Sequence, residues 1–144
     1  MKKLLVSIAA GAGVLLAAAS LSLAGSKRTR TAALTAGQET PKQTVKTPAA
    51  HGQFKATLSG NTLKWRLTFA KLSGPATAAH IHMAARGKSG GVVVPLCGPC
   101  TGGQTGSTAV SRSVIAAFNK HELYVNVHTA KNPDGEIRGQ ILAG

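Results

Sequence analysis

Three of the five histidines lie in two short segments whose residues alternate between apolar and polar types. The segments are 79–83 (AHIHM) and Leu123–Thr129 (LYVNVHT). Because alternation with period two predicts a strand with one buried face, the polar residues of each segment should share the opposite face. These polar-face residues are His80 and His82 in the first segment, and Tyr124, Asn126 and His128 in the second. The pattern therefore predicts a sheet face on which imidazoles could bind a metal ion or another ligand.

A metal ion suits this spacing. Alternate residues of a strand lie about 6.5–7 Å apart on one face, so His80 and His82 can chelate one ion, and His128 can supply a third nitrogen from a neighbouring strand. Imidazole nitrogens favour copper and zinc, and tetragonal nitrogen ligation favours Cu(II). One copper ion is therefore the candidate cofactor. In the alternative interpretation, the three histidines bind backbone groups or one another beneath a loop that covers the sheet.

The two cysteines, Cys97 and Cys100, have the spacing of a thioredoxin-like redox pair. Such a pair needs its first cysteine at a helix N-terminus, which lowers the pKa of the thiol. The glycine-rich residues 101–106 do not predict a helix. In an oxidising compartment the two thiols are expected to form a structural disulfide. Auxiliary metal ligation and redox catalysis are the alternatives.

The acidic residues are too few to suggest general acid–base catalysis. The chain has four, which are Glu39, Glu122, Asp134 and Glu136. The sequence shows no evident carboxylate pair among them and no nucleophile-elbow pattern around its serines. We therefore assign no catalytic residue and expect that the protein is not an enzyme. The other two histidines, His51 and His121, are predicted to be exposed on the surface.

Short alternating runs separated by turn residues predict an all-β domain. The runs on either side of Gly60 and Asn61 alternate, and a two-residue loop there would pair Leu58 with Leu63 and keep both apolar sets on one face. Three further predictions are a short strand at 92–94 ended by Pro95, a glycine-rich loop at 97–107 and one helical turn at 114–119. The sequence shows no repeat and no second domain.

The last predicted hairpin adds a constraint on register. Residues 132–135 (NPDG) form a strong turn sequence. Because Val127 and Ile137 must share a face, paired residue numbers across this hairpin must sum to an even value. The same parity places Arg138 on the face of His128. A guanidinium is therefore predicted beside the imidazole cluster.

The N-terminus has the features of a secretory signal peptide. Two lysines precede the apolar residues 4–19, and small residues before Ala24 suit cleavage after that position. The protein is then exported by the Sec pathway, to be secreted or to associate with the cell envelope. The apolar stretch is also about long enough to be an uncleaved membrane anchor, which is the alternative. The predicted division is a signal peptide at 1–24, a basic flexible tether at 25–33 and one domain at 34–144.

The positive charge of the chain limits its partners. Removing Lys2 and Lys3 lowers the formal charge from +13 to +11. The basic residues are scattered except at 27–30, and the chain has only five aromatic residues, so it lacks the stacking platforms of a nucleic-acid binder. The charge suits adhesion to anionic cell-envelope polymers or lipid headgroups, or simply solubility. We expect a monomer that binds such polymers or an extracellular protein.

The two histidine segments and the last hairpin resemble the CHRD domain, named for its occurrence in chordin. The stretches that carry the resemblance are 77–82 (TAAHIH), Leu123–Thr129 (LYVNVHT) and 135–141 (GEIRGQI), with 34–41 (LTAGQETP) as the opening motif. The likeness covers about residues 32–143. It implies a secreted or surface protein of undefined biochemical activity.

A second resemblance, to copper,zinc superoxide dismutases, bears on mechanism. Those enzymes are Greek-key β-sandwiches with a His-x-His strand and a later Val-His strand. The resemblance implies that His80, His82 and His128 are copper ligands and that Arg138 lies near the position of a substrate-guiding arginine. The sequence offers no candidate for the metal-bridging histidine and no zinc loop, which favours a mononuclear site for copper capture or storage over dismutation.

Together these observations predict a Greek-key antiparallel β-sandwich that acts as a non-catalytic extracellular or cell-envelope binding module. Its alternative function is mononuclear copper binding. Tyr124, Asn126 and Arg138 are the residues expected to surround the ligand.

Overall fold

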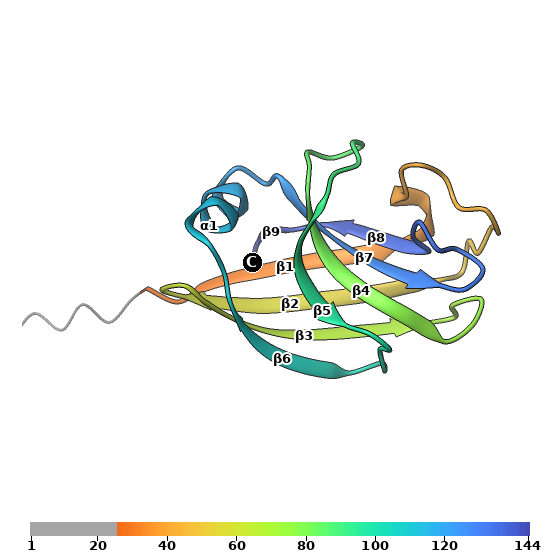
Figure 1. Ribbon diagram of the computed structural model, residues 1–144, viewed down its shortest axis with the longest axis horizontal. Coiled ribbons are helices and arrows are strands. Elements are labelled where there is room, and N and C mark those ends of the chain that lie inside the picture. Colours follow the sequence, from red (N-terminus) through yellow and green to blue (C-terminus); the bar gives the residue numbers. More distant parts are fainter. Residues whose placement is uncertain (1–25) are drawn as a thin grey trace, which may run out of the picture.

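The computed structural model describes residues 26–144, so the predicted signal peptide lies outside the described residues (Figure 1). The elements in chain order are β1 (Arg28–Thr35), the 3-10 helix η1 (Ala36–Gln38), β2 (His51–Ser59), β3 (Thr62–Ala70), β4 (Ala76–Met83), β5 (Val92–Cys97), β6 (Gln104–Ala109), α1 (Arg112–Asn119), β7 (Leu123–Thr129), β8 (Ile137–Gln140) and β9 (Leu142–Ala143). No helix within this range is long and apolar enough to cross a bilayer.

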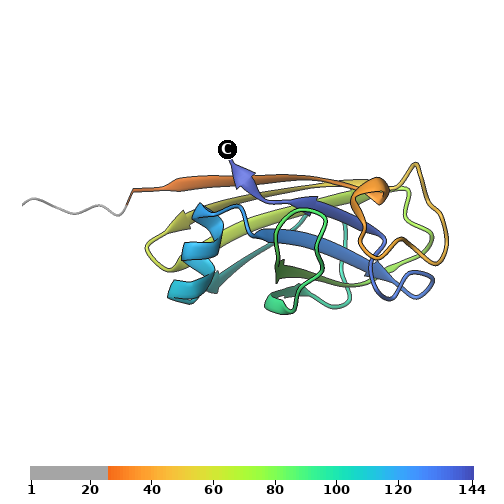
Figure 2. The same cartoon turned by 90° about the horizontal axis from the view of Figure 1, so that it is seen from above.

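The strands form one antiparallel sheet with the order β5-β4-β7-β8-β1-β2-β3-β6, and β9 pairs with β1. The sheet curls into a nearly closed sandwich, in which β4, β5 and β7 lie over β2 and β3 (Figures 1 and 2). The chain crosses to another part of the sheet through the short segment 71–75 between β3 and β4 and through α1 between β6 and β7, so that strands distant in sequence become neighbours. The predicted Greek-key β-sandwich is confirmed. Helix α1 lies at one end and the loop between η1 and β2 at the other.

The core lies between the two layers and is built from the apolar set of each alternating strand. Its fully buried members include Phe54, Leu63, Leu67, Ile81, Val125 and Val127. The β2–β3 register pairs Leu58 with Leu63, as the loop at Gly60 and Asn61 predicts. Gly60 adopts a φ of 58°, a conformation that costs glycine no strain. The β7–β8 register pairs Val127 with Ile137, which confirms the predicted parity.

The prediction of a flexible tether is wrong for residues 28–33, because this segment belongs to β1. All eight residues of β1 pair with β2, from Arg28 opposite Leu58 to Thr35 opposite His51. Ala32 and Leu34 face the core. Local composition suggested a solvated basic segment, but long-range strand pairing and the burial of two apolar side chains override it.

Strand β5 is longer than predicted, and β6 lies largely where a loop was predicted. Strand β5 continues through Pro95 to Cys97, and it can do so because it is an edge strand, where the missing N–H group breaks no ladder. Most of the predicted loop at 97–107 is replaced by the disulfide turn and by β6. Gly106 lies opposite Trp65, and a Cβ atom there would lie 2.4 Å from the indole ring. The glycine therefore serves close packing within a strand.

Helix α1 extends the single turn predicted at 114–119 to eight residues. Its N-terminus is capped by Ser111, whose Oγ accepts a hydrogen bond from the backbone N–H of Val114 at 3.3 Å. Val114, Ala117 and Phe118 form its buried face. The helix thus covers the open end of the sandwich before the chain enters β7.

Candidate metal centre

Pairing between β4 and β7 brings the three predicted ligands together. His80 lies opposite Asn126, and His82 lies opposite Tyr124 in this antiparallel ladder. Because neighbouring strands are about 4.8 Å apart, the polar faces of the two strands merge into one. His128 reaches the same group from the far end of β7.

The three imidazoles converge closely. His80 Nδ1 lies 3.2 Å from His128 Nε2, and the ring centroids of His82 are 5.7 Å from those of His80 and 5.9 Å from those of His128. One ring nitrogen from each histidine lies within 4.8 Å of the other two. Within residues 26–144 this is the group of histidine, cysteine or acidic side chains that could hold a metal ion. Two nitrogens that bind one ion at about 2 Å each lie at most about 4 Å apart, so the three rings would have to move slightly closer together to share one ion.

Backbone carbonyls determine which nitrogens of two ligands are available. His82 Nδ1 lies 2.9 Å from the carbonyl oxygen of Gly90, and His128 Nδ1 lies 2.9 Å from that of Pro133. Since a carbonyl oxygen can only accept, each Nδ1 carries the proton and each Nε2 carries a lone pair. Nε2 of His82 is buried and makes no hydrogen bond. Such hydrogen bonds from the second nitrogen are how proteins orient metal-binding histidines.

His80 completes the group with a different nitrogen. Because Nε2 of His128 is an acceptor, Nδ1 of His80 donates to it in the absence of an ion. To hold an ion, both nitrogens would have to present lone pairs, and His80 would then carry its proton on Nε2. The ring of His80 is half-buried, and its other nitrogen has no partner among the hydrogen bonds of residues 26–144.

Burial keeps the three rings neutral. It lowers the pKa of His80, His82 and His128 below the ordinary value of 6.5, and proximity among the rings lowers the pKa values of His82 and His128 further. The carbonyls of Gly90 and Pro133 oppose this effect in part. Neutral imidazole is the form that binds metal ions. At neutral pH the three rings are therefore in the protonation state that metal binding requires.

Tyr124 and Arg138 lie beside the imidazole group in a stack. The ring of Tyr124 is parallel to that of His82, with centroids 4.9 Å apart and an interplanar angle of 10°. The guanidinium of Arg138 lies 3.5 Å from the centroid of Tyr124, and only the opposite ring face has room for it. The phenol oxygen of Tyr124 accepts a hydrogen bond from the N–H of Gly90 at 3.2 Å. The phenol ring thus separates Arg138 from His82, so the guanidinium lies beside the imidazole group with Tyr124 between them.

The β4–β5 loop covers this polar face, and the three rings contact backbone carbonyls or one another, as the alternative interpretation of the histidines expected. Arg138 is 2% exposed, and its Nη2 donates to the carbonyl of Ala85 in the β4–β5 loop at 3.4 Å. Gln140 donates to the carbonyls of Ala84 and His121. The β4–β5 loop also supplies Gly90, which holds His82. The loop therefore both shields and orients the centre.

Glu39 is a member of this buried network that sequence reasoning did not identify. Its carboxylate is 1% exposed and accepts two hydrogen bonds from Nδ2 of Asn126, at 2.9 and 3.0 Å. Burial raises the pKa of Glu39 to about 7, while the hydrogen bond from Asn126 and the charge of Arg138 oppose that rise. The stretch 34–41 that resembles the opening motif of the CHRD domain contains Glu39 and was the available signal.

Glu136 plays a structural part on the same side of the sheet. Its carboxylate accepts hydrogen bonds from Ser73, Thr129 and Asn132. These contacts lower the pKa of Glu136 in spite of its burial. They tie the β3–β4 loop to the turn that carries Pro133, and so support the carbonyl that orients His128.

The remaining predicted residues lie as follows. Cys97 and Cys100 form the expected disulfide, so neither offers a free thiol for metal binding in this state. His51 and His121 are exposed, as predicted.

The comparisons with known proteins identify the family of the chain. The model of the CHRD domain matches residues 30–141. No curated protein and no solved structure matches the chain. The resemblance to copper,zinc superoxide dismutases is therefore not confirmed. CHRD domains occur in extracellular proteins. The match spans nearly all of the described fold, and the chain belongs to the CHRD domain family.

Proposed function

We propose that this protein is an exported, non-catalytic binding module that holds one copper ion through His80, His82 and His128. The observation that carries the proposal is that hydrogen bonds fix the orientation and the protonation of two of the ligands. Two of the three histidines have their second nitrogen tied to a backbone carbonyl, which aims a lone pair at the centre. One of those lone pairs, on Nε2 of His82, is buried without a partner.

The donor set favours copper over other ions. Three neutral imidazoles without a carboxylate suit copper and zinc and disfavour the hard ions magnesium and calcium. Among divalent first-row ions at a given site, Cu(II) binds most tightly. The stacked pair of Tyr124 and Arg138 closes one side of the centre. Copper would bring redox chemistry when bound, while the chain's own residues orient the ligands and exclude water.

The burial of the centre supports a role in the capture or storage of copper. His128 is 9% exposed, and the β4–β5 loop lies over His82. His80 is half-buried and is the most accessible of the three ligands, so a metal ion would approach the centre from the side of His80. No carboxylate belongs to this group of ligands among residues 26–144, so the group lacks the oxygen ligands that hard cations prefer.

Metal titration tests this proposal. Metal-free protein titrated with Cu(II) should bind one equivalent tightly, and Zn(II) should bind more weakly. The variants His80→Ala and His128→Ala should lose at least a hundredfold in affinity, while His121→Ala, which removes an exposed histidine, should bind as the wild type does. Micromolar or weaker copper binding that is unchanged by the first two substitutions would refute the proposal.

A further inference from the structure

Two arginines converge at the α1 end of the sandwich, away from the imidazole centre. Arg28 and Arg30 are alternate residues of β1. Nη1 of Arg28 and Nη2 of Arg30 donate to the same atom, Oδ1 of Asn119 at the end of α1, at 3.3 and 3.1 Å. Residues 27–30, which composition marked as a basic tether, thus become part of a defined cluster.

The cluster has positive charge, and no side-chain carboxylate of residues 26–144 accepts a hydrogen bond from it. Arg30 is 6% exposed, and its Nε atom is buried without a hydrogen-bond partner. Its other acceptor within residues 26–144 is the neutral carbonyl of Thr29, at 3.2 Å. The chain before Ser26 contains no Asp or Glu. Burial and the charge of Arg28 both lower the pKa of Arg30. A buried cation without a counter-charge is costly, and an anion bound here would relieve that cost.

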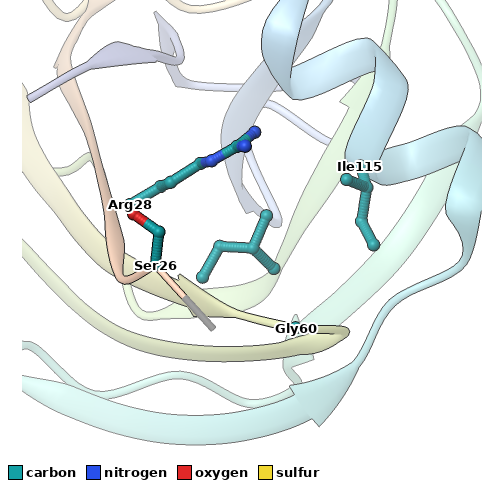
Figure 3. Close-up of a pocket in the computed structure, with 5 residues that line it drawn as sticks. Ser26, Arg28, Gly60 and Ile115 are labelled. Carbon is teal, nitrogen blue, oxygen red and sulfur yellow. The ribbon is translucent and has the colours of Figure 1, made fainter. Parts of the chain in front are cut away.

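A small pocket lies beside Arg28, whose guanidinium shares its Asn119 acceptor with the guanidinium of Arg30. Its volume is about 220 Å³, and its lining residues are Ser26, Arg28, Leu58, Gly60 and Ile115. In Figure 3, Ile115 on α1 lies across the pocket from Ser26 and Arg28. Pockets for drug-sized ligands begin at roughly 300 Å³. The space therefore suits a small ligand that has both a charged and an apolar part.

We propose that this pocket binds a small phosphate monoester. The phosphoryl oxygens would accept hydrogen bonds from Arg28 and Arg30, since planar guanidinium groups pair with phosphate through two parallel hydrogen bonds. A phosphoryl group has enough oxygens to engage both arginines. The carbon part of the ligand would pack on Leu58 and Ile115. This site is separate from the proposed copper centre and does not depend on it.

Titration calorimetry with phenyl phosphate and with inorganic phosphate, at constant ionic strength, tests the proposal. Phenyl phosphate should bind the wild-type protein, and inorganic phosphate should bind several-fold more weakly because it lacks the apolar part. Arg28→Gln, which alters an exposed side chain, and Arg30→Gln should each raise the Kd at least tenfold. The matched control Arg66→Gln removes an exposed arginine from the outer face of β3 and should leave the Kd within twofold.

The control variants distinguish binding at this pocket from non-specific electrostatic attraction of phosphate to the protein. Since Arg28 is exposed, Arg28→Gln is expected to fold even if Arg30→Gln does not. The Arg28 variant is therefore sufficient to test the proposal. An unchanged Kd in Arg28→Gln, or an equal loss in Arg66→Gln, would overturn the proposal. Binding of inorganic phosphate as tight as that of phenyl phosphate would overturn the assignment of the apolar wall.

Discussion

Replacing Glu39 with glutamine is expected to stabilise the protein at alkaline pH and to leave its stability nearly unchanged in acid. Burial raises the pKa of Glu39 from 4.5 to about 7 in the folded protein. The folded state therefore binds this proton more tightly than the unfolded state does. The free energy of unfolding of the wild type must then fall as the pH rises from 4.5 to 7, because the carboxylate has to ionise in a buried position.

The size of the effect follows from that difference. One pKa unit corresponds to about 1.4 kcal/mol, so the rise from 4.5 to about 7 corresponds to about 3 kcal/mol above pH 7. Because Glu39 is only 1% exposed, solvent screening removes little of this amount. Glutamine has nearly the same shape, and its amide can donate to Oδ1 of Asn126, which is buried without a hydrogen bond.

Urea unfolding of the metal-free protein at several pH values between 4.5 and 8 measures this prediction. The difference in free energy of unfolding between Glu39→Gln and wild type should grow from near zero to about 3 kcal/mol across that range. Titration of the histidines affects both proteins equally and cancels in the difference. The matched control Glu122→Gln, at a partly exposed position, should show a difference that stays within about 0.5 kcal/mol. A difference for Glu39→Gln that does not change with pH would refute the reasoning.

Two further predictions concern the sheet and the metal centre. A Cβ atom on Gly139 would lie 2.5 Å from the carbonyl oxygen of Ala33, so Gly139→Ala should cost about 1–3 kcal/mol in urea unfolding, whereas Gly91→Ala, with open space around it, should not. Three imidazoles with a pKa of 6.5 would lose about 50-fold in metal affinity between pH 7.5 and pH 6 through proton competition. Since burial lowers the pKa of all three ligands, the loss measured by Cu(II) titration should be smaller, and a 50-fold or greater loss would contradict it.

Local alternation predicted the hairpins and the faces of their side chains well. A strand has a side-chain period of two, and a slip of one residue would move every apolar side chain out of the core. The pairing of Leu58 with Leu63 and of Val127 with Ile137 follows from that rule. The same rule placed Arg138 on the side of the sheet that carries His128.

Segments with weak local signals were the ones predicted incorrectly. Strand β6 contains Gly106 and few apolar residues, and it forms because it pairs with β3 across the ring of Trp65. The start of β1 looks like a solvated basic segment until β2 is beside it. In both cases the stabilising contacts come from residues far away in the sequence, which local composition does not describe.

The imidazole centre depends both on local alternation in the sequence and on long-range strand pairing. Alternation within 79–83 and within β7 is sufficient to place His80, His82 and His128 on polar strand faces. Their convergence to within 4.8 Å depends on β4 lying beside β7, two strands separated by about forty residues of chain. The protonation of the second nitrogens of His82 and His128 depends on the carbonyls of Gly90 and Pro133, which the loops supply only when folded over the sheet. Side-chain direction is a local property of the backbone, whereas proximity and burial are set by non-local pairing.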